Sequence, residues 1–174
     1  MFKKLFFIVI ISAFFSSYQV FANSANFLYE EGVKAAKSGN LDKAFMNFRA
    51  LIREYPKSRF RENALFGLGE YYFHIADYHD ASLIFIQLID SYPDSESKIF
   101  SLVYLLEIAK KQQSQDLIEK LEKDILTFKQ HSFIFKDFKK YSYSSPLAKK
   151  YKAVYFIDKI EFYIDGELFT TTRY

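Results

Sequence analysis

The sequence predicts a mostly α-helical chain of stacked antiparallel helix hairpins, an α-solenoid, followed by a small β-hairpin. A repeat of 37 residues with helical apolar spacing predicts the stack. A C-terminal segment rich in β-branched and aromatic residues, with an Asp-Gly pair, predicts the hairpin. The 174 residues contain no cysteine, so an apolar core and not a disulfide framework must stabilise the fold.

Residues 1–22 have the organisation of a signal peptide. Two lysines, Lys3 and Lys4, precede an apolar run over 5–15, and Val20-Phe21-Ala22 offers a cleavage site before Asn23. The apolar run is 11 residues long, whereas a spanning helix needs about 20. We therefore expect an exported, periplasmic chain that begins near Asn23, with an uncleaved anchor as the alternative. Without a cysteine, N-terminal lipidation is not expected.

Two copies of the repeat align over residues 25–58 and 62–95. A shift of 37 residues superposes Leu28 on Leu65, Gly32 on Gly69, Ala44 on Ala81, Phe48 on Phe85, Leu51-Ile52 on Leu88-Ile89, Tyr55-Pro56 on Tyr92-Pro93 and Ser58 on Ser95. Many of these residues are of types that packing constrains, so the two copies are expected to fold alike.

Each copy is expected to contain two helices. In the second helix of copy one, apolar residues recur at spacings of three and four between Leu41 and Tyr55 and form one stripe. Gly39 is suited to end the helix before it, because glycine readily takes the positive φ of a helix C-cap. Pro56 and Pro93 are expected to end the second helices, because the residue before proline avoids the helical region.

The small residues of the repeat indicate where helices cross. A glycine or an alanine at a crossing lets two backbones approach closely, and a phenylalanine one turn later can fill the space between hairpins. The residues expected to pack the repeats in this way are Gly32, Ala44 and Phe48 in copy one and Gly69, Ala81 and Phe85 in copy two.

A third, degenerate copy is expected over residues 99–130, which extends the helical domain to 25–130. Leu102 and Leu105 fall on Leu65 and Leu68 at the same shift, but Leu106 replaces the repeat glycine. The apolar residues of the second helix align only if one turn residue is missing. We expect this copy to cap the stack, because the end of a stack is atypical.

Residues 131–174 form an extension rich in aromatic residues and lysine. Apolar runs on both sides of Asp165-Gly166 predict a β-hairpin over 153–172, since a type I′ turn needs positive φ at both central residues. An isolated hairpin is marginal in water, so it must pack on the stack, pair with a further strand or be ordered by a partner. We expect it to fold back over copy two, with docking driven by Phe133, Phe135 and Phe138.

Glycine, alanine, phenylalanine and proline at these spacings resemble the tetratricopeptide repeat. The 37-residue period and the Tyr-Pro-x-Ser ending of each copy are most similar to periplasmic envelope members of that family, such as the Tol-Pal-associated cell-division coordinator and the lipoprotein of the outer-membrane barrel assembly machine. The resemblance implies a concave face, formed by the first helix of each repeat, that binds a partner protein of the envelope. Position by position, that face comprises Asn26, Tyr29, Val33, Lys37, Asn63, Phe66, Glu70, Phe73, His74, Phe100, Val103, Glu107 and Lys110.

An interaction scaffold is thus the leading interpretation, and a permanent structural subunit of an envelope machine, docked through its C-terminal segment, is the alternative. No set of residues places a nucleophile beside a base, so an enzyme is not expected, and no cofactor is implied. A metal site at His74 and His79 is disfavoured because the pair lacks helical i, i+4 spacing.

Charge is distributed in blocks along the chain. Residues 62–97 contain seven acids and no lysine or arginine, whereas residues 129–159 have a net charge of +6. Lysines interleaved with aromatics are compatible with nucleic-acid binding. An exported chain rarely meets nucleic acid, however, so contact with an anionic membrane surface is favoured over nucleic-acid binding. The alternative for all these blocks is that they are solvated helix faces.

Overall fold

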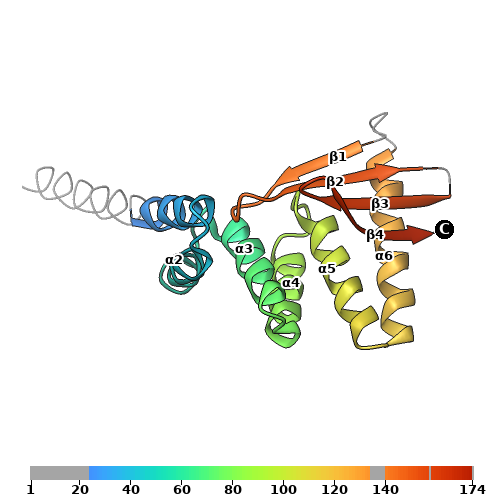
Figure 1. Cartoon of the computed structure of the whole chain (residues 1–174), viewed down its shortest axis with the longest axis horizontal. Coiled ribbons are helices and arrows are strands. Elements are labelled where there is room, and N and C mark those ends of the chain that lie inside the picture. Colours follow the sequence, from blue (N-terminus) through green and yellow to red (C-terminus); the bar gives the residue numbers. More distant parts are fainter. Residues whose placement is uncertain (1–23, 134–139, 157, 174) are drawn as a thin grey trace, which may run out of the picture.

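The computed structural model describes residues 24–133, 140–156 and 158–173. The segment expected to be a signal peptide, and the phenylalanines at 135 and 138, lie outside these ranges. A helix over residues 24–37 is followed by α2 (Leu41–Glu54), α3 (Arg61–His74), α4 (Tyr78–Ser91), α5 (Lys98–Lys111) and α6 (Gln115–Phe133). The helices pair into three antiparallel hairpins that stand side by side (Figure 1). None of the described helices is both long and apolar enough to cross a membrane.

The 37-residue period continues through the third hairpin. The second helices begin at Leu41, Tyr78 and Gln115, and each start is 37 residues after the last. Each first helix is followed by one residue with a positive φ, in the left-handed region. These residues keep the same period, with φ of 79° at Gly39, 61° at Ala76 and 56° at Gln113. The expectation that the third copy lacks a turn residue is therefore wrong. Its turn is complete, and its buried residue Ile125 takes the position of Leu51 and Leu88, whereas the buried Leu121 lies one residue before the position of Phe48 and Phe85.

The helix ends have local causes in the sequence. Asn40 and Asp77 cap α2 and α4, because their side chains accept hydrogen bonds from the backbone N–H groups of Lys43 and Asp80. Both helices end before a Tyr-Pro pair, so Pro56 and Pro93 end them as predicted.

Each repeat glycine lies under an aromatic ring of the helix that follows it. A Cβ atom added at Gly32 would lie 2.5 Å from Cε1 of Phe48, and one added at Gly69 would lie 2.6 Å from Cε1 of Phe85. Phe48 also approaches the next hairpin, because a Cβ atom at Gly67 would be 3.1 Å from its Cε2. The two phenylalanines and the nearby Ala44 and Ala81 are fully buried.

The C-terminal segment forms a four-stranded antiparallel sheet, which is larger than the single hairpin expected over 153–172. The strands are β1 (Lys140–Ser144), β2 (Lys150–Tyr155), β3 (Lys159–Ile164) and β4 (Glu167–Arg173), in the spatial order β1-β2-β3-β4. The predicted Asp165-Gly166 turn joins β3 to β4, with φ of 52° and 91°. The extra hairpin turns at residues 145–149, where the backbone N–H of Ala148 donates to the carbonyl of Ser145. The two additional strands let the sheet cover more of the apolar face of the helical stack than one hairpin could cover.

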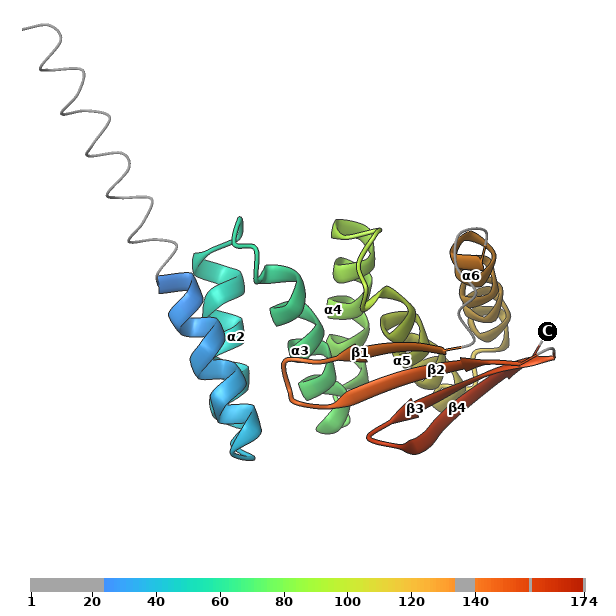
Figure 2. The same cartoon turned by 90° about the horizontal axis from the view of Figure 1, so that it is seen from above.

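The sheet lies across one face of the helical stack, over α3 and α5 (Figures 1 and 2). Its inner face and the stack share one apolar core, in which Tyr151, Ala153, Ile160 and Phe162 of the sheet are buried. Tyrosines on β1 and β2 supply much of the described contact with α5, and the docking role expected of Phe133, Phe135 and Phe138 lies outside the side chains that the structure describes. Tyr141, Tyr143 and Tyr151 all pack against the ring of Phe100. The segment therefore folds back over copy two, and it also covers copy three.

Candidate functional site

The face made by the first helices of the repeats is covered by the sheet over copies two and three. Phe66 and Glu70 of α3 and Phe100 and Val103 of α5 are buried. The ring of Phe66 contacts Tyr143 and Tyr151 edge-on, at centroid distances of 5.2 and 5.4 Å. These predicted partner-binding side chains do lie on one face, but the chain's own C-terminal sheet occupies it. A partner can reach them only if the sheet is displaced.

The rim of the covered face is held by polar contacts. Tyr143 Oη donates to Asn63 Oδ1 at 3.2 Å, at the β1 edge of the sheet. At the β4 edge, Lys110 Nζ bridges Glu107 Oε1, at 2.9 Å, and Thr170 Oγ1, at 2.8 Å. The half-buried Phe73 packs on Phe169, whereas His74 at the end of α3 is exposed.

A buried carboxyl lies at the centre of the covered face. Glu70 has no exposed surface, and its Oε1 accepts hydrogen bonds from Tyr151 Oη at 2.5 Å and from Ser145 Oγ at 3.1 Å. Lys149 Nζ, in the β1–β2 turn, lies 4.0 Å from the same oxygen. Oε2 has no hydrogen-bond partner among the described residues. Burial is the main reason that the pKa of Glu70 is raised to about 7.

Two tyrosines extend this cluster from the sheet into α5. The hydroxyls of Tyr104 and Tyr151 are 2.6 Å apart. Because Tyr151 directs its proton to Glu70, Tyr104 must donate to Tyr151. Burial raises the pKa of both tyrosines well above its usual value, so both hydroxyls stay protonated and available as donors.

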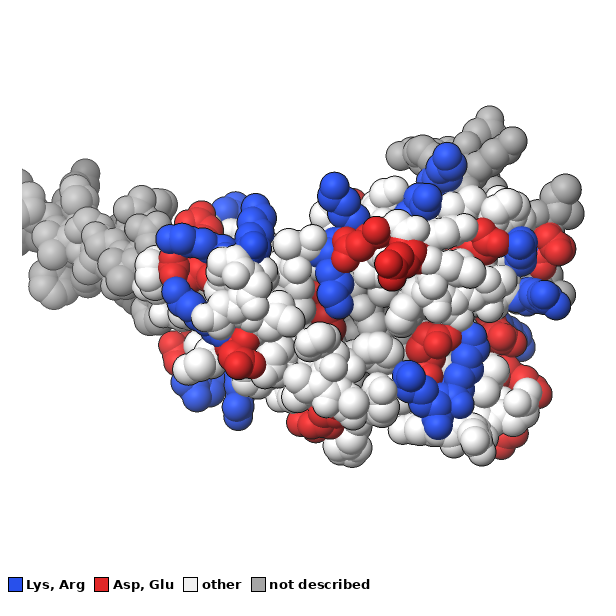
Figure 3. Space-filling model, viewed as in Figure 1, with Lys and Arg blue, Asp and Glu red and all other residues white. Residues whose placement is uncertain are grey.

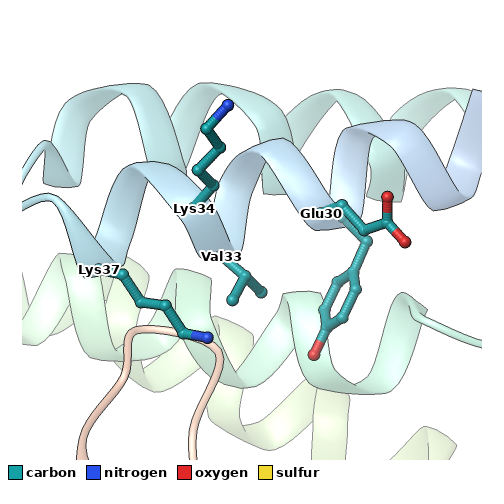
Figure 4. Close-up of a pocket in the computed structure, with 5 residues that line it drawn as sticks. Glu30, Val33, Lys34 and Lys37 are labelled. Atoms are coloured by element: carbon teal, nitrogen blue, oxygen red, sulfur yellow. The ribbon is translucent and has the colours of Figure 1, made fainter.

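Over copy one the face stays open and forms a shallow pocket. Tyr29, Glu30, Val33, Lys34 and Lys37 line this pocket, which has a volume of about 370 Å³. Lys37 reaches toward the β1–β2 turn, and Lys34 points away from it (Figure 4). Tyr29 stacks on Phe60 with a centroid distance of 4.6 Å, which holds its ring at one side of the pocket. The predicted residues Tyr29, Val33 and Lys37 are thus together, whereas Asn26, which donates a hydrogen bond to Glu30, is not part of the pocket lining.

Sequence reasoning missed the partners of Glu70, namely Tyr104, Ser145, Lys149 and Tyr151. One signal was present, because Glu70 is the only charged residue between Asn63 and His74 on an apolar helix. Such a carboxyl must find partners if it is buried. The sequence did not indicate which residues of the C-terminal segment would supply them.

The polar groups of the covered face connect the sheet to the helical stack. Within the described parts of the chain, no three His, Cys, Asp or Glu side chains gather closely enough to hold a metal ion. The buried groups are two phenols, a hydroxyl and a carboxyl, and the sheet separates them from solvent.

The helical fold is that of tetratricopeptide-repeat proteins. The chain is similar to the crystal structure of a tetratricopeptide repeat protein from Parabacteroides merdae ATCC 43184, with 15% identity and a TM-score of 0.55 over 62% of this chain. It spans 41% of that protein's length. No curated protein matches the sequence. Residues 21–156 match the family YfiO, described as outer membrane lipoprotein, and this match covers well over half of the chain. The chain therefore belongs to the YfiO family of outer membrane lipoproteins.

Proposed function

We propose that the chain is a non-enzymatic, protein-binding scaffold of the cell envelope that takes an extended partner segment in the pocket of its first repeat. The observation that carries the proposal is this pocket of about 370 Å³, where the repeat face stays open beside the covered part. The family description, an outer membrane lipoprotein, supports the envelope as the place of action.

The pocket has the chemistry of a peptide site. Tyr29 and Val33 offer apolar surface, and Lys34 and Lys37 add positive charge. Lys34 is 80% exposed and only 3.6 Å from Glu31, whereas Lys37 has no acidic partner among the described residues. Exposed pairs are worth about 0–1 kcal/mol each, so a partner can replace them at little cost. We expect the bound segment to carry an apolar anchor next to an acidic residue.

The covered part of the face has a different role in this proposal. Its predicted residues Phe66, Glu70, Phe100 and Val103 stay under the sheet and fix the stack beside the pocket. The alternative, a permanent subunit docked through the C-terminal segment, must use the outer face of the sheet, because the inner face is packed on the stack. The open pocket favours the scaffold.

Site-specific photo-crosslinking in the native envelope tests the pocket. A photoreactive amino acid at Val33 or at Lys37 is expected to capture one defined envelope protein. The matched control is Met46, which lies on the same hairpin, is 67% exposed and does not line the pocket. Equal capture of the same protein from Met46, or none from both pocket positions, would remove the support for this site.

Two substitutions separate binding from folding. Val33→Asp and Lys37→Glu are expected to weaken the captured interaction by about tenfold each, because each removes one feature of the site. Lys43→Glu, on the same hairpin but outside the pocket lining, is the charge-matched control for Lys37→Glu. All variants should keep the helical circular dichroism of the wild type. Unchanged affinity in both pocket variants contradicts the proposal.

Export is the remaining part of the proposal. The predicted cleavage site lies before Asn23, so intact-mass measurement of the protein from its native host is expected to show a chain that begins there. A mass that includes residues 1–22 would instead indicate an uncleaved anchor, and an unprocessed chain in the cytoplasm would contradict action in the envelope.

A further inference from the structure

The outer face of the C-terminal sheet is rich in cations. Residues alternate in direction along a strand, so every second side chain of this sheet points away from the stack. The strand register and the burial pattern place the following side chains on that face: Lys140, Ser142, Ser144, Lys150, Lys152, Val154, Lys159, Glu161, Tyr163, Leu168, Thr171 and Arg173. Five of these residues are basic and one is acidic. Figure 3 shows basic side chains along the upper edge of the molecule, where Figure 1 draws β1 and β2.

The negative charge of the single acid on this face is balanced by a neighbouring lysine. Glu161 accepts hydrogen bonds from Lys159 Nζ at 2.7 Å and from Tyr163 Oη at 2.5 Å. Its pKa is lowered, first of all by the hydrogen bond from Lys159, so it remains an ionised and paired carboxylate. The other acids of the sheet, Asp158, Asp165 and Glu167, lie at the hairpin ends.

The half of the face made by β1 and β2 carries lysines without acids. Lys150 lies opposite Ser144, Lys152 opposite Ser142, and Lys140 opposite Val154. Lys152 Nζ also lies 4.6 Å above the ring centre of Tyr163. Three positive charges therefore stand on a hydroxyl-rich surface where no described acid faces them across the β1–β2 pair. The carboxylate of Asp165, at the end of β3, accepts from the backbone N–H of Lys150 at 2.8 Å.

Apolar side chains accompany these charges. Phe156, in the β2–β3 turn, is 42% exposed, and Leu168 of β4 is 57% exposed. Cations beside exposed aromatic and aliphatic groups are the combination that peripheral proteins present to an anionic bilayer, where lysine binds phosphate and apolar groups enter the headgroup region.

We propose that the outer face of the sheet docks the chain on an anionic phospholipid surface. The three lysines of β1 and β2 contact headgroup phosphates, and Phe156 and Leu168 enter the boundary below them. A lipid surface fits better than an acidic protein, because the lysines are spread over a pleated face and converge on no pocket. Docking through this face holds a scaffold of the outer membrane family at its membrane even when no partner is bound.

Vesicle sedimentation tests the proposal. The full chain and the chain that begins at Asn23 are mixed with phosphatidylcholine vesicles, with or without about one-third phosphatidylglycerol. Both chains are expected to prefer the anionic vesicles, and the preference should weaken as salt rises. The variant K140Q/K150Q/K152Q is expected to lose on the order of 100-fold in partition coefficient on anionic vesicles. The control K57Q/K120Q/K123Q, with the same charge change on exposed lysines of the stack, is expected to lose less than threefold.

The outcomes separate the possible ligands. Loss confined to the sheet variant, with unchanged thermal midpoints, supports docking through this face. Equal loss in both variants indicates a general charge effect and overturns the proposal. No preference for anionic vesicles overturns it as well. If soluble polyglutamate binds, loses affinity in the sheet variant and vesicles do not bind, the face belongs to an acidic protein and the lipid proposal fails.

Discussion

Tyr151 of β2 donates a hydrogen bond of 2.5 Å to Glu70 of α3, and this contact joins the C-terminal sheet to the second repeat. Both side chains are buried, and they are 81 residues apart in the sequence. An isolated buried carboxylate is costly, so this glutamate depends on the sheet for its partners. The sheet in turn contacts the repeats through this carboxyl, because Tyr151 of β2 and Ser145 of the β1–β2 turn both donate hydrogen bonds to it.

The stability of the protein is expected to fall as pH rises from about 5 to 8. The pKa of Glu70 is about 7 in the folded chain and 4.5 for an ordinary glutamate, so the folded state holds the proton more tightly. Stabilisation by the neutral carboxyl is complete below pH 4.5, is lost as pH rises through 7, and is absent above. Each pKa unit corresponds to about 1.4 kcal/mol, so the free energy of unfolding should drop by roughly 2–3 kcal/mol.

Urea denaturation at the two pH values measures this drop, and Glu70→Gln is the control. Glutamine has the same shape and cannot ionise, so its stability should change little between pH 5 and 8. Comparing the slopes of the two proteins removes the contribution of all other titrating groups. Equal pH slopes in wild type and variant would contradict the assignment to Glu70.

Tyr151→Phe is expected to destabilise the fold more than Tyr143→Phe. The first change removes a buried donor to Glu70 and also leaves the hydroxyl of Tyr104 without its acceptor. A loss of about 1–3 kcal/mol is typical when a buried polar group loses its partner. Tyr143 makes a longer bond of 3.2 Å to Asn63 in a partly buried place, so its loss should be under about 1 kcal/mol. Thermal denaturation of the two variants gives the ranking, and equal losses would argue against a special role for Tyr151.

The helical repeats were predictable from the sequence because their determinants are local. The capping residues Asn40 and Asp77 and the glycine–phenylalanine pairs act within one hairpin, and a sequence repeat reports such contacts directly. The third repeat was harder, since Glu122 replaces the phenylalanine that follows the crossing and the buried Leu121, one residue earlier, lies there instead.

The sheet and the candidate site were predictable only in part. The Asp165-Gly166 turn has a strong local signal, whereas β1 has five residues, lies at the edge of the sheet and packs through Tyr141 and Tyr143 on α5. Tyr29, Val33 and Lys37 lie together because one helix carries them. The cover over Phe66 and Phe100 depends on contacts between distant segments, which neither periodicity nor motif spacing reports.

Ala81→Leu is expected to destabilise the second hairpin by about 1–3 kcal/mol. Ala81 has no exposed surface, so three added carbons must displace its neighbours. Ser82→Leu is the matched control, because Ser82 is only half-buried and its hydroxyl bonds the backbone of its own helix. Urea denaturation should show little change in that variant. Equal destabilisation at the two positions would show that the side chain of Ala81 is not at the crossing.

Gly69→Ala is expected to destabilise the fold because the new methyl group meets the ring of Phe85, and a second substitution at Phe85 can test this cause. The new methyl would lie 2.6 Å from Cε1 of Phe85, far inside van der Waals contact, and the buried ring has little room to move. We expect a loss of about 1–3 kcal/mol for Gly69→Ala alone and about 1–2 kcal/mol for Phe85→Leu alone. The double variant should be more stable than the sum of the two losses predicts, because leucine leaves space for the methyl.

A double-mutant cycle on the free energy of unfolding measures this coupling. Residues in contact show coupling energies of about 0.5–3 kcal/mol. Gly166 is a poor control, because its φ of 91° strains any alanine placed there whatever the space. The pair Gly69→Ala with Phe48→Leu is better matched, since Phe48 packs on Gly32 of the first repeat and not on Gly69. That pair should be additive, and an additive result for Gly69 with Phe85 would mean that helix propensity and not the ring accounts for the glycine.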